Sequence, residues 1–139
     1  METRLAENTI SQILEILQSS IPALCAVYLF GSQSRGESTA VSDIDIAFLA
    51  DRITDVQNTW QIAQEIGGKV GKDIDLVDLR ESSTVFRMQV ISKGCRILVE
   101  DYMGIEVFED NVYSDYARLN EERKYILSDI QEQGSVYAR

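Results

Sequence analysis

The sequence from residue 25 to residue 49 reads CAVYLFGSQSRGESTAVSDIDIAFL. It opens with an unbroken apolar run, 25–30, and closes on residues 43–49, which alternate between polar and apolar before becoming wholly apolar. The first pattern is typical of a strand buried on both faces, and the second also indicates a strand. Residues 31–42 are rich in glycine, serine and threonine, which predicts a polar loop. Two strands joined by this loop form the centre of the predicted fold.

One helix is predicted before this pair of strands in the sequence, and one after it. Apolar residues at three- and four-residue steps predict a helix over residues 10–21, which Pro22 ends. A second helix is predicted from Thr54, with Gln57 as its partner in a capping box, through about Val70, and Gly71 closes it. Its inner side is expected to comprise Val56, Trp60, Ala63 and either Ile66 or Gly67.

The following segment continues the alternation of strands and helices. Residues 74–79 predict a third strand because apolar positions dominate them. A shorter helix follows, capped by Ser82 or Ser83 and ended by Gly94. Residues 96–99 predict a short fourth strand.

The last third of the chain is predicted to be helical and carries many acidic residues. Spaced apolar residues predict a long helix over about 107–133, with a potential break near Asn111, and its outer face is heavily acidic. The predicted order is therefore α-β-β-α-β-α-β-α. It gives one α/β (α+β) domain over residues 1–139, a small mixed sheet packed with helices, with a core at about 10–100 and a C-terminal helical arm at about 105–133.

Composition excludes several classes of function. The 139 residues include 13 Lys+Arg and 23 Asp+Glu, a net charge of −10, and no dense basic cluster, so direct binding of nucleic acid is not expected. There is no histidine. Zinc deaminase, HExxH protease and Ser-His-Asp chemistry are therefore excluded for this chain acting alone. The remaining chemistry must use carboxylates, hydroxyls, amides and metal ions.

The cysteines and the apolar runs indicate the compartment. Cys25 and Cys95 lie in largely apolar surroundings without metal-ligand spacing, so they are expected to be core residues in a reducing compartment. No targeting segment is recognisable, and the longest apolar stretch, 23–30, is too short to span a bilayer. A cytoplasmic protein without membrane contact is expected.

The loop after the first strand begins with a potential phosphate site. Gly31 directly follows a buried strand, which allows a sharp turn and lets its amide approach a ligand oxygen. Ser32 adds a hydroxyl donor beside it. Such a dipeptide taken alone is also a common turn.

Three carboxylates follow on two strands. Because strand side chains alternate, Asp43 and Asp45 are expected on one face while the intervening isoleucines enter the core. Adjacent like charges favour a bound cation, and Mg²⁺ prefers such oxygen ligands. Asp75 lies in the next strand among apolar residues and is the third candidate ligand. Taken singly, the aspartate pair could be solvated, and Asp75 could pair with Lys69 or Lys72.

Taken together, this pattern resembles that of the polymerase-β-type nucleotidyltransferase superfamily, and within it the minimal nucleotidyltransferase (MNT) group. The family pattern is a strand, Gly-Ser, Arg-Gly, Ser-Asp-x-Asp and an aspartate in a later strand. It matches Gly31, Ser32, Arg35, Gly36, Ser42, Asp43, Asp45 and Asp75. The resemblance implies the nucleotidyltransferase fold, with ATP as substrate and Mg²⁺ as cofactor.

The resemblance also implies roles for these residues. The nucleotide-binding residues would be Gly31, Ser32, Arg35, Gly36 and Ser42. Asp43 and Asp45 would bind Mg²⁺, and Asp75 would share one metal and help to deprotonate the acceptor. Arg35 would steady the phosphates or the loop.

A stand-alone catalytic core of this kind resembles the MNT antitoxins of HEPN/MNT toxin–antitoxin pairs. Those antitoxins bind a HEPN ribonuclease and transfer AMP from ATP to a tyrosine near its ribonuclease motif. Without histidine, this chain lacks the Arg-x-x-x-x-His signature of the toxin. Residues 100–139 hold 10 acidic and 4 basic side chains, which suits a positively charged ribonuclease as partner. Two alternatives stay open: an antitoxin that masks its toxin by contact alone, and a small-molecule nucleotidyltransferase of the aminoglycoside-modifying type.

Overall fold

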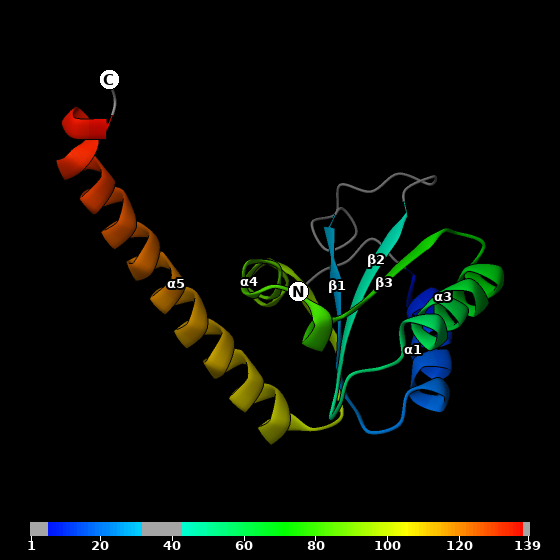
Figure 1. The fold of residues 1–139 in the computed structure, drawn as a ribbon. Helices are drawn as coiled ribbons and strands as arrows, with labels where there is room; N and C mark the ends of the chain where they lie inside the picture. Colours follow the sequence, from blue (N-terminus) through cyan, green and yellow to red (C-terminus); the bar gives the residue numbers. More distant parts are fainter. Residues whose placement is uncertain (1–5, 32–42, 138–139) are drawn as a thin grey trace.

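The structure is a computed structural model that describes residues 6–31 and 43–137 (Figure 1). Along the chain it contains α1 (Glu7–Ser20), β1 (Leu24–Phe30), β2 (Ile44–Ala50), α3 (Val56–Val70), β3 (Ile74–Asp78), a short 3₁₀ helix η1 (Leu79–Glu81), α4 (Thr84–Lys93), β4 (Cys95–Val99) and α5 (Tyr102–Tyr137). These elements confirm the predicted order of helices and strands. They also confirm a sheet packed with helices, ending in a long helix.

The four strands form one mixed sheet in the order β3-β2-β1-β4. β1 runs antiparallel to both neighbours, β2 and β4, whereas β2 and β3 run parallel. The end of β1 and the starts of β2 and β3 therefore meet at one end of the sheet. Gly31, Asp43 and Asp73 all lie at that end.

Each face of the sheet carries a layer of helices. α1 and α3 cover one face, and α4 with the first part of α5 covers the other (Figure 1). In β2, Ile44, Ile46 and Phe48 pack in the core beneath α1 and α3, while Ala47 and Leu49 pack in the core beneath α4 and α5. The central strands need apolar side chains on both faces, which is why their sequences are almost continuously apolar.

Both cysteines are core residues, as predicted. Cys25 and Cys95 are buried and free. Burial, followed by the nearby negative charge of Asp101, raises the pKa of the Cys25 thiol. The thiol therefore stays protonated at neutral pH and fills space as a small apolar group.

Two predicted helix ends are confirmed by their hydrogen bonds. Gly71 ends α3 in the left-handed conformation with φ of +74°, and its N–H donates to the carbonyl of Gly67 at 2.9 Å. Ser83 caps α4, because its Oγ accepts the N–H of Phe86 at 3.1 Å. Both contacts are local, so the sequence alone could predict them.

The predicted capping box at Thr54 is wrong. α3 begins at Val56, and its N-cap, Asp55, makes no side-chain capping bond. The N–H of Thr54 instead donates to the carboxylate of Asp78 at 2.9 Å, and the same carboxylate accepts the N–H of Arg80 at 3.0 Å. Asp78 is 6% exposed and ties the segment before α3 to the end of β3.

The predicted inner side of α3 is also partly wrong. Its buried residues are Ile62, Ala63 and Ile66, whereas Val56 is 74% exposed and Trp60 is 62% exposed. Only Ala63 and Ile66 of the predicted stripe enter the core. The reason is topological: α3 lies beside β3 at the edge of the sheet, so its outer side has no strand to cover it.

Helix α5 is longer and more regular than predicted. It begins at Tyr102, where the carboxylate of Asp101 accepts the N–H of Gly104 at 3.0 Å, and it runs through Asn111 without a break. Its C-terminal half extends away from the sheet (Figure 1), and residues 121–131 are all exposed. None of the described helices has the length and apolar character that crossing a bilayer requires.

A buried polar cluster fixes the first part of α5 to the sheet. The hydroxyl of Tyr28 in β1 donates to Glu109 at 2.6 Å, and Arg96 in β4 donates to both carboxylate oxygens of Glu109, at 2.6 and 3.1 Å. Burial, together with the hydrogen bond to Glu109 and its charge, raises the pKa of Tyr28 far above its ordinary value. Glu109 is 7% exposed and thus departs from the acidic outer face expected for this helix.

Candidate active site

Gly31 makes the sharp turn that was predicted for the end of β1. Its φ of +68° lies in the left-handed region that side chains disfavour. A Cβ at this position would also overlap Oδ2 of Asp45. The preceding residue, Phe30, packs edge-on against Phe86 of α4 with ring centroids 5.4 Å apart. The absence of a side chain thus lets the Asp45 carboxylate lie directly against the backbone of the turn.

Asp43 and Asp45 stand at the start of β2. Asp43 is exposed and Asp45 is half-buried. Ile44 and Ile46, which alternate with them, are fully buried in the core beneath α1 and α3, as predicted. Strand alternation therefore directs Asp45 to the face of the sheet that carries α4, and Asp43 occupies the equivalent position just before the strand.

Asp75 lies beside Asp45 on the neighbouring strand. The two are in register in the parallel β2–β3 pair, and adjacent strands are spaced about 4.8 Å apart. The residues flanking Asp75, Ile74 and Leu76, pack toward α1 and α3, so Asp75 shares the face of Asp45. In the part of the chain that the structure describes, Asp75 forms no ion pair with a lysine. The alternative of a structural salt bridge is not realised there.

Asp43, Asp45 and Asp75 supply the kind of oxygen ligand that Mg²⁺ prefers, although their three side chains do not converge on a single metal position. Across residues 6–31 and 43–137, no three acidic or cysteine side chains form a group that could hold a metal ion. What the fold provides is a shared face, with Asp45 and Asp75 in register and Asp43 two residues before Asp45. Carboxylate oxygens are the hard donors that Mg²⁺ prefers. The assignment of these three residues as metal ligands stays a prediction.

The other predicted nucleotide-binding residues fall in the loop between β1 and β2. The positions outside the described residues are Ser32, Arg35, Gly36 and Ser42. Phe30 and Asp45, on either side of these positions in the sequence, are partners in the antiparallel β1–β2 pair. Gly31, the last described residue before them, lies next to the carboxylate of Asp45.

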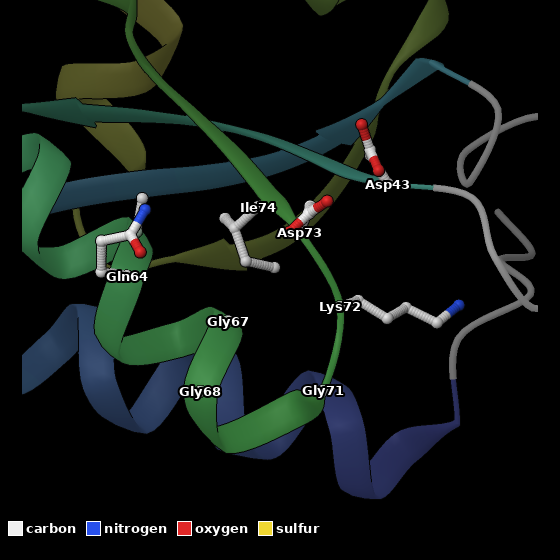
Figure 2. A pocket seen from close by; sticks show the side chains of 9 residues that line it. Asp43, Gln64, Gly67, Gly68, Gly71, Lys72, Asp73 and Ile74 are labelled. Carbon is white, nitrogen blue, oxygen red and sulfur yellow. The ribbon is translucent and has the colours of Figure 1, made fainter.

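A polar cavity of about 490 Å³ opens next to Asp43 (Figure 2). It lies between the C-terminal half of α3 and the starts of β2 and β3. Its lining residues are Asp43, Ala63, Gln64, Gly67, Gly68, Gly71, Lys72, Asp73 and Ile74. The volume falls within the range typical of small-molecule sites. The cavity thus adds a recess to the end of the sheet that carries Gly31 and the aspartates.

The glycines of this cavity were not predicted as site residues. Gly67 allows α3 to approach the segment before β3, because a Cβ there would lie 2.9 Å from the carbonyl oxygen of Lys72. Gly68 meets nothing within 4 Å. The available signal was the Gly67–Gly68 pair inside a predicted helix, since each glycine costs a helix about 1 kcal/mol relative to alanine.

Comparison with known proteins agrees with this geometry. The family model described as "Polymerase beta, Nucleotidyltransferase" matches residues 11–102. The curated protein adenylyltransferase MntA of Shewanella oneidensis is 39% identical over 120 residues, which cover 86% of each chain. The fold also matches a crystal structure of a toxin–antitoxin with AMP-PNP, with a TM-score of 0.79, 38% identity, and coverage of 88% of this chain and 98% of the other.

A further solved structure is the MNT antitoxin in complex with a tri-AMPylated Shewanella oneidensis HEPN toxin. It matches with a TM-score of 0.74 and 35% identity, and covers 90% of this chain and 98% of the other. These matches span the described sheet and helices rather than the short motif alone. The glycine turn, the aspartates in register and the sequence around them thus have one explanation: the chain belongs to the polymerase β-type nucleotidyltransferase family.

Proposed function

We propose that this chain is a Mg²⁺-dependent protein adenylyltransferase that transfers AMP from ATP to a tyrosine of a HEPN-type ribonuclease toxin and thereby acts as its antitoxin in the cytoplasm. The observation that carries the chemistry is the position of Asp45, which lies against the Gly31 turn and beside Asp75 on the same face. The 39% identity to a protein adenylyltransferase, and the likeness to an antitoxin in complex with an AMPylated HEPN toxin, support this substrate and partner.

In the proposed reaction, an acceptor oxygen attacks the α-phosphorus of ATP. A bond forms between this oxygen and phosphorus, the bond from the α-phosphorus to its bridging oxygen breaks, and pyrophosphate leaves. Asp75 accepts the proton of the acceptor hydroxyl. Asp43 and Asp45 would hold Mg²⁺, which when bound neutralises developing charge on the phosphates. The Gly31 amide, together with Ser32, would hold phosphate oxygens at the turn.

Charge supports a toxin as the partner. A ribonuclease must attract RNA and therefore presents positive charge. The last 40 residues, 100–139, carry 10 acidic and 4 basic side chains, and the whole chain has a net charge of −10. An acidic partner is steered toward a basic surface of this kind.

The proposal is tested with the purified chain, ATP, Mg²⁺ and the product of the neighbouring gene. Mass spectrometry of that product should show a gain of one or more AMP groups, located on tyrosine, and chelation of divalent ions should abolish the gain. Inhibition of the toxin without any mass gain would instead identify a binding-only antitoxin. Nucleotide transfer to an aminoglycoside in the absence of a protein partner would identify a small-molecule enzyme.

Replacing Gly31 with alanine should lower both stability and activity. A left-handed alanine costs about 1–2 kcal/mol in the free energy of unfolding, and its Cβ would also displace the Asp45 carboxylate. The rate of AMP transfer should fall at least about tenfold, because small displacements at a reacting centre have large effects. Gly71→Ala is the matched control, since its φ is +74° but a Cβ there meets nothing within 4 Å. Equal transfer rates in the two variants would contradict the role of Gly31.

A further inference from the structure

A second groove, of about 460 Å³, follows the outer edge of the sheet. Its lining residues are Thr54, Val56, Thr59, Trp60, Ala63, Gln64, Ile74, Asp75, Leu76, Val77, Asp78, Glu81 and Ser82. All five residues of β3 are included. Because neighbouring strand residues face opposite sides of a sheet, only a groove that runs along the strand edge can touch all five. The groove therefore exposes the backbone of β3.

Among the described residues, no strand pairs with the outer edge of β3. β3 is the terminal strand of the described sheet. The N–H of Ile44 donates to the carbonyl of Asp73 at 3.0 Å, which sets the phase of the parallel ladder. Residues 73, 75 and 77 thus bond toward β2, and the N–H and C=O groups of Ile74 and Leu76 point outward. An unpaired edge of this kind is a template for another strand.

The wall of the groove supplies an apolar anchor. Trp60 is 62% exposed and Val56 is 74% exposed, and both stand on α3 beside the open edge. A large exposed aromatic side chain next to an unpaired strand edge is typical of a surface that another chain covers. In complexes formed by strand addition, the backbone supplies affinity and such side-chain pockets supply specificity.

We propose that the outer edge of β3 binds the acceptor segment of the target protein as an additional strand, placing its modified tyrosine beside Asp75. This rests on the proposed function. A residue opposite Asp75 would direct its side chain to the face that carries Asp45 and Asp75. Its two neighbours in the added strand would face the other way, toward Trp60. The fold thereby selects a tyrosine flanked by apolar residues.

Charge defines the occupant further. All charged side chains that line the groove, namely those of Asp75, Asp78 and Glu81, are acidic. Asp78 is already bonded to the N–H groups of Thr54 and Arg80, so Asp75 and Glu81 set the charge of the open groove. A segment with lysine or arginine near the tyrosine fits this rim. A second copy of this chain would instead bring acidic rims together, which disfavours pairing of two such edges.

Trp60→Ala tests the anchor. The KM for the acceptor protein should rise at least about tenfold, as expected for loss of a central aromatic contact, while the KM for ATP and the rate at saturating acceptor stay close to the parent values. Gln61→Ala is the matched control, since Gln61 is exposed on the same helix and does not line the groove. An unchanged KM for the acceptor in Trp60→Ala would overturn the proposal.

A second measurement reports binding without the reaction. Trp60 is the only tryptophan of the chain, so its fluorescence reports cover of the groove directly. The probes are overlapping tryptophan-free peptides that tile the acceptor protein, and the one containing the modified tyrosine should shift the emission to shorter wavelength. N-methylation of every second backbone amide should abolish this shift in one phase and preserve it in the other, because only one set of amides faces β3.

The outcomes separate this proposal from the proposed function. Transfer of AMP without any fluorescence shift, or a shift with no dependence on the phase of N-methylation, would overturn strand addition and leave the proposed function standing. A phase-dependent shift without transfer would support the docking edge and contradict the proposed chemistry. A change in the Trp60 emission wavelength when the chain alone is diluted or concentrated would identify a second copy of the chain as the occupant of the groove. It would overturn the assignment of the groove to the acceptor protein.

Discussion

Replacing Asp45 with asparagine is expected to lower the rate of AMP transfer by at least about 10³-fold while leaving the fold intact. Asparagine has nearly the same shape but no charge, and Asp45 is the carboxylate that lies against Gly31 and in register with Asp75. Loss of a charge at a metal and phosphate site removes about 4 kcal/mol or more of transition-state stabilisation when the group acts in the reaction. Initial rates of pyrophosphate release measure this effect directly.

Asp55→Asn is the matched control for this experiment. Asp55 is exposed, stands at the N-cap of α3 and makes no side-chain capping bond. It should retain most of the transfer activity, because it lines neither the cavity beside Asp43 nor the groove beside β3. Circular dichroism and urea unfolding should be close to those of the parent for both variants. An Asp45→Asn protein that is folded and fully active would remove the basis of the proposed chemistry.

Replacing Glu109 with alanine is expected to lower the free energy of unfolding by about 2–4 kcal/mol. The substitution removes the acceptor of the Tyr28 hydroxyl, which is almost fully buried, and of both hydrogen bonds from Arg96. An unpaired buried hydroxyl and a partly buried guanidinium each carry a cost. The Arg96 side chain is 33% exposed, so water can solvate part of its charge and the loss stays below that of a fully buried pair.

Urea unfolding followed by circular dichroism measures this loss. Glu109→Gln keeps an acceptor for Tyr28 and should lose about half as much, since charge-assisted hydrogen bonds are roughly twice as strong as neutral ones. Asp110→Ala is the control on the next, exposed position of α5 and should change stability by less than about 0.5 kcal/mol. Equal stabilities of the alanine variants at 109 and 110 would show that the cluster does not hold α5 to the sheet.

Local chemistry explains why much of the fold was predictable. The apolar runs of β1 and β2, the left-handed Gly71 and the Ser83 cap each depend on residues close in sequence. The turn at Gly31 and the burial of the isoleucines beside Asp43 and Asp45 follow from the same kind of reasoning. These features can be predicted without knowing the order of the strands in the sheet.

The incorrect or missing predictions depend on contacts between distant segments. Trp60 was assigned to the core because a helical stripe contains it, but its exposure follows from the position of β3 at the edge of the sheet. The capping box at Thr54 failed because the carboxylate of Asp78, 24 residues away, accepts the N–H of Thr54, which the side chain of Gln57 would accept in a capping box. Glu109 could not be distinguished from the acidic surface of α5 without Tyr28, which lies 81 residues earlier.

The candidate site combines both kinds of information. The alternation of side chains along β2 predicted which face of the sheet Asp45 occupies. Its register with Asp75 depends instead on the parallel pairing of β2 with β3, two strands that α3 separates in the sequence. The groove beside β3 was beyond sequence reasoning for the same reason, since an edge is defined only once the order of strands is known.

The projecting half of α5 adds little to the packing that holds the sheet and its helices together. Its exposed residues, 121–131, are held in shape by the helix's own ladder of bonds and touch little else. Substitutions there consequently leave the folding equilibrium of the catalytic body almost untouched. The sequence of this segment can therefore vary without loss of the sheet geometry that brings Asp45 and Asp75 together.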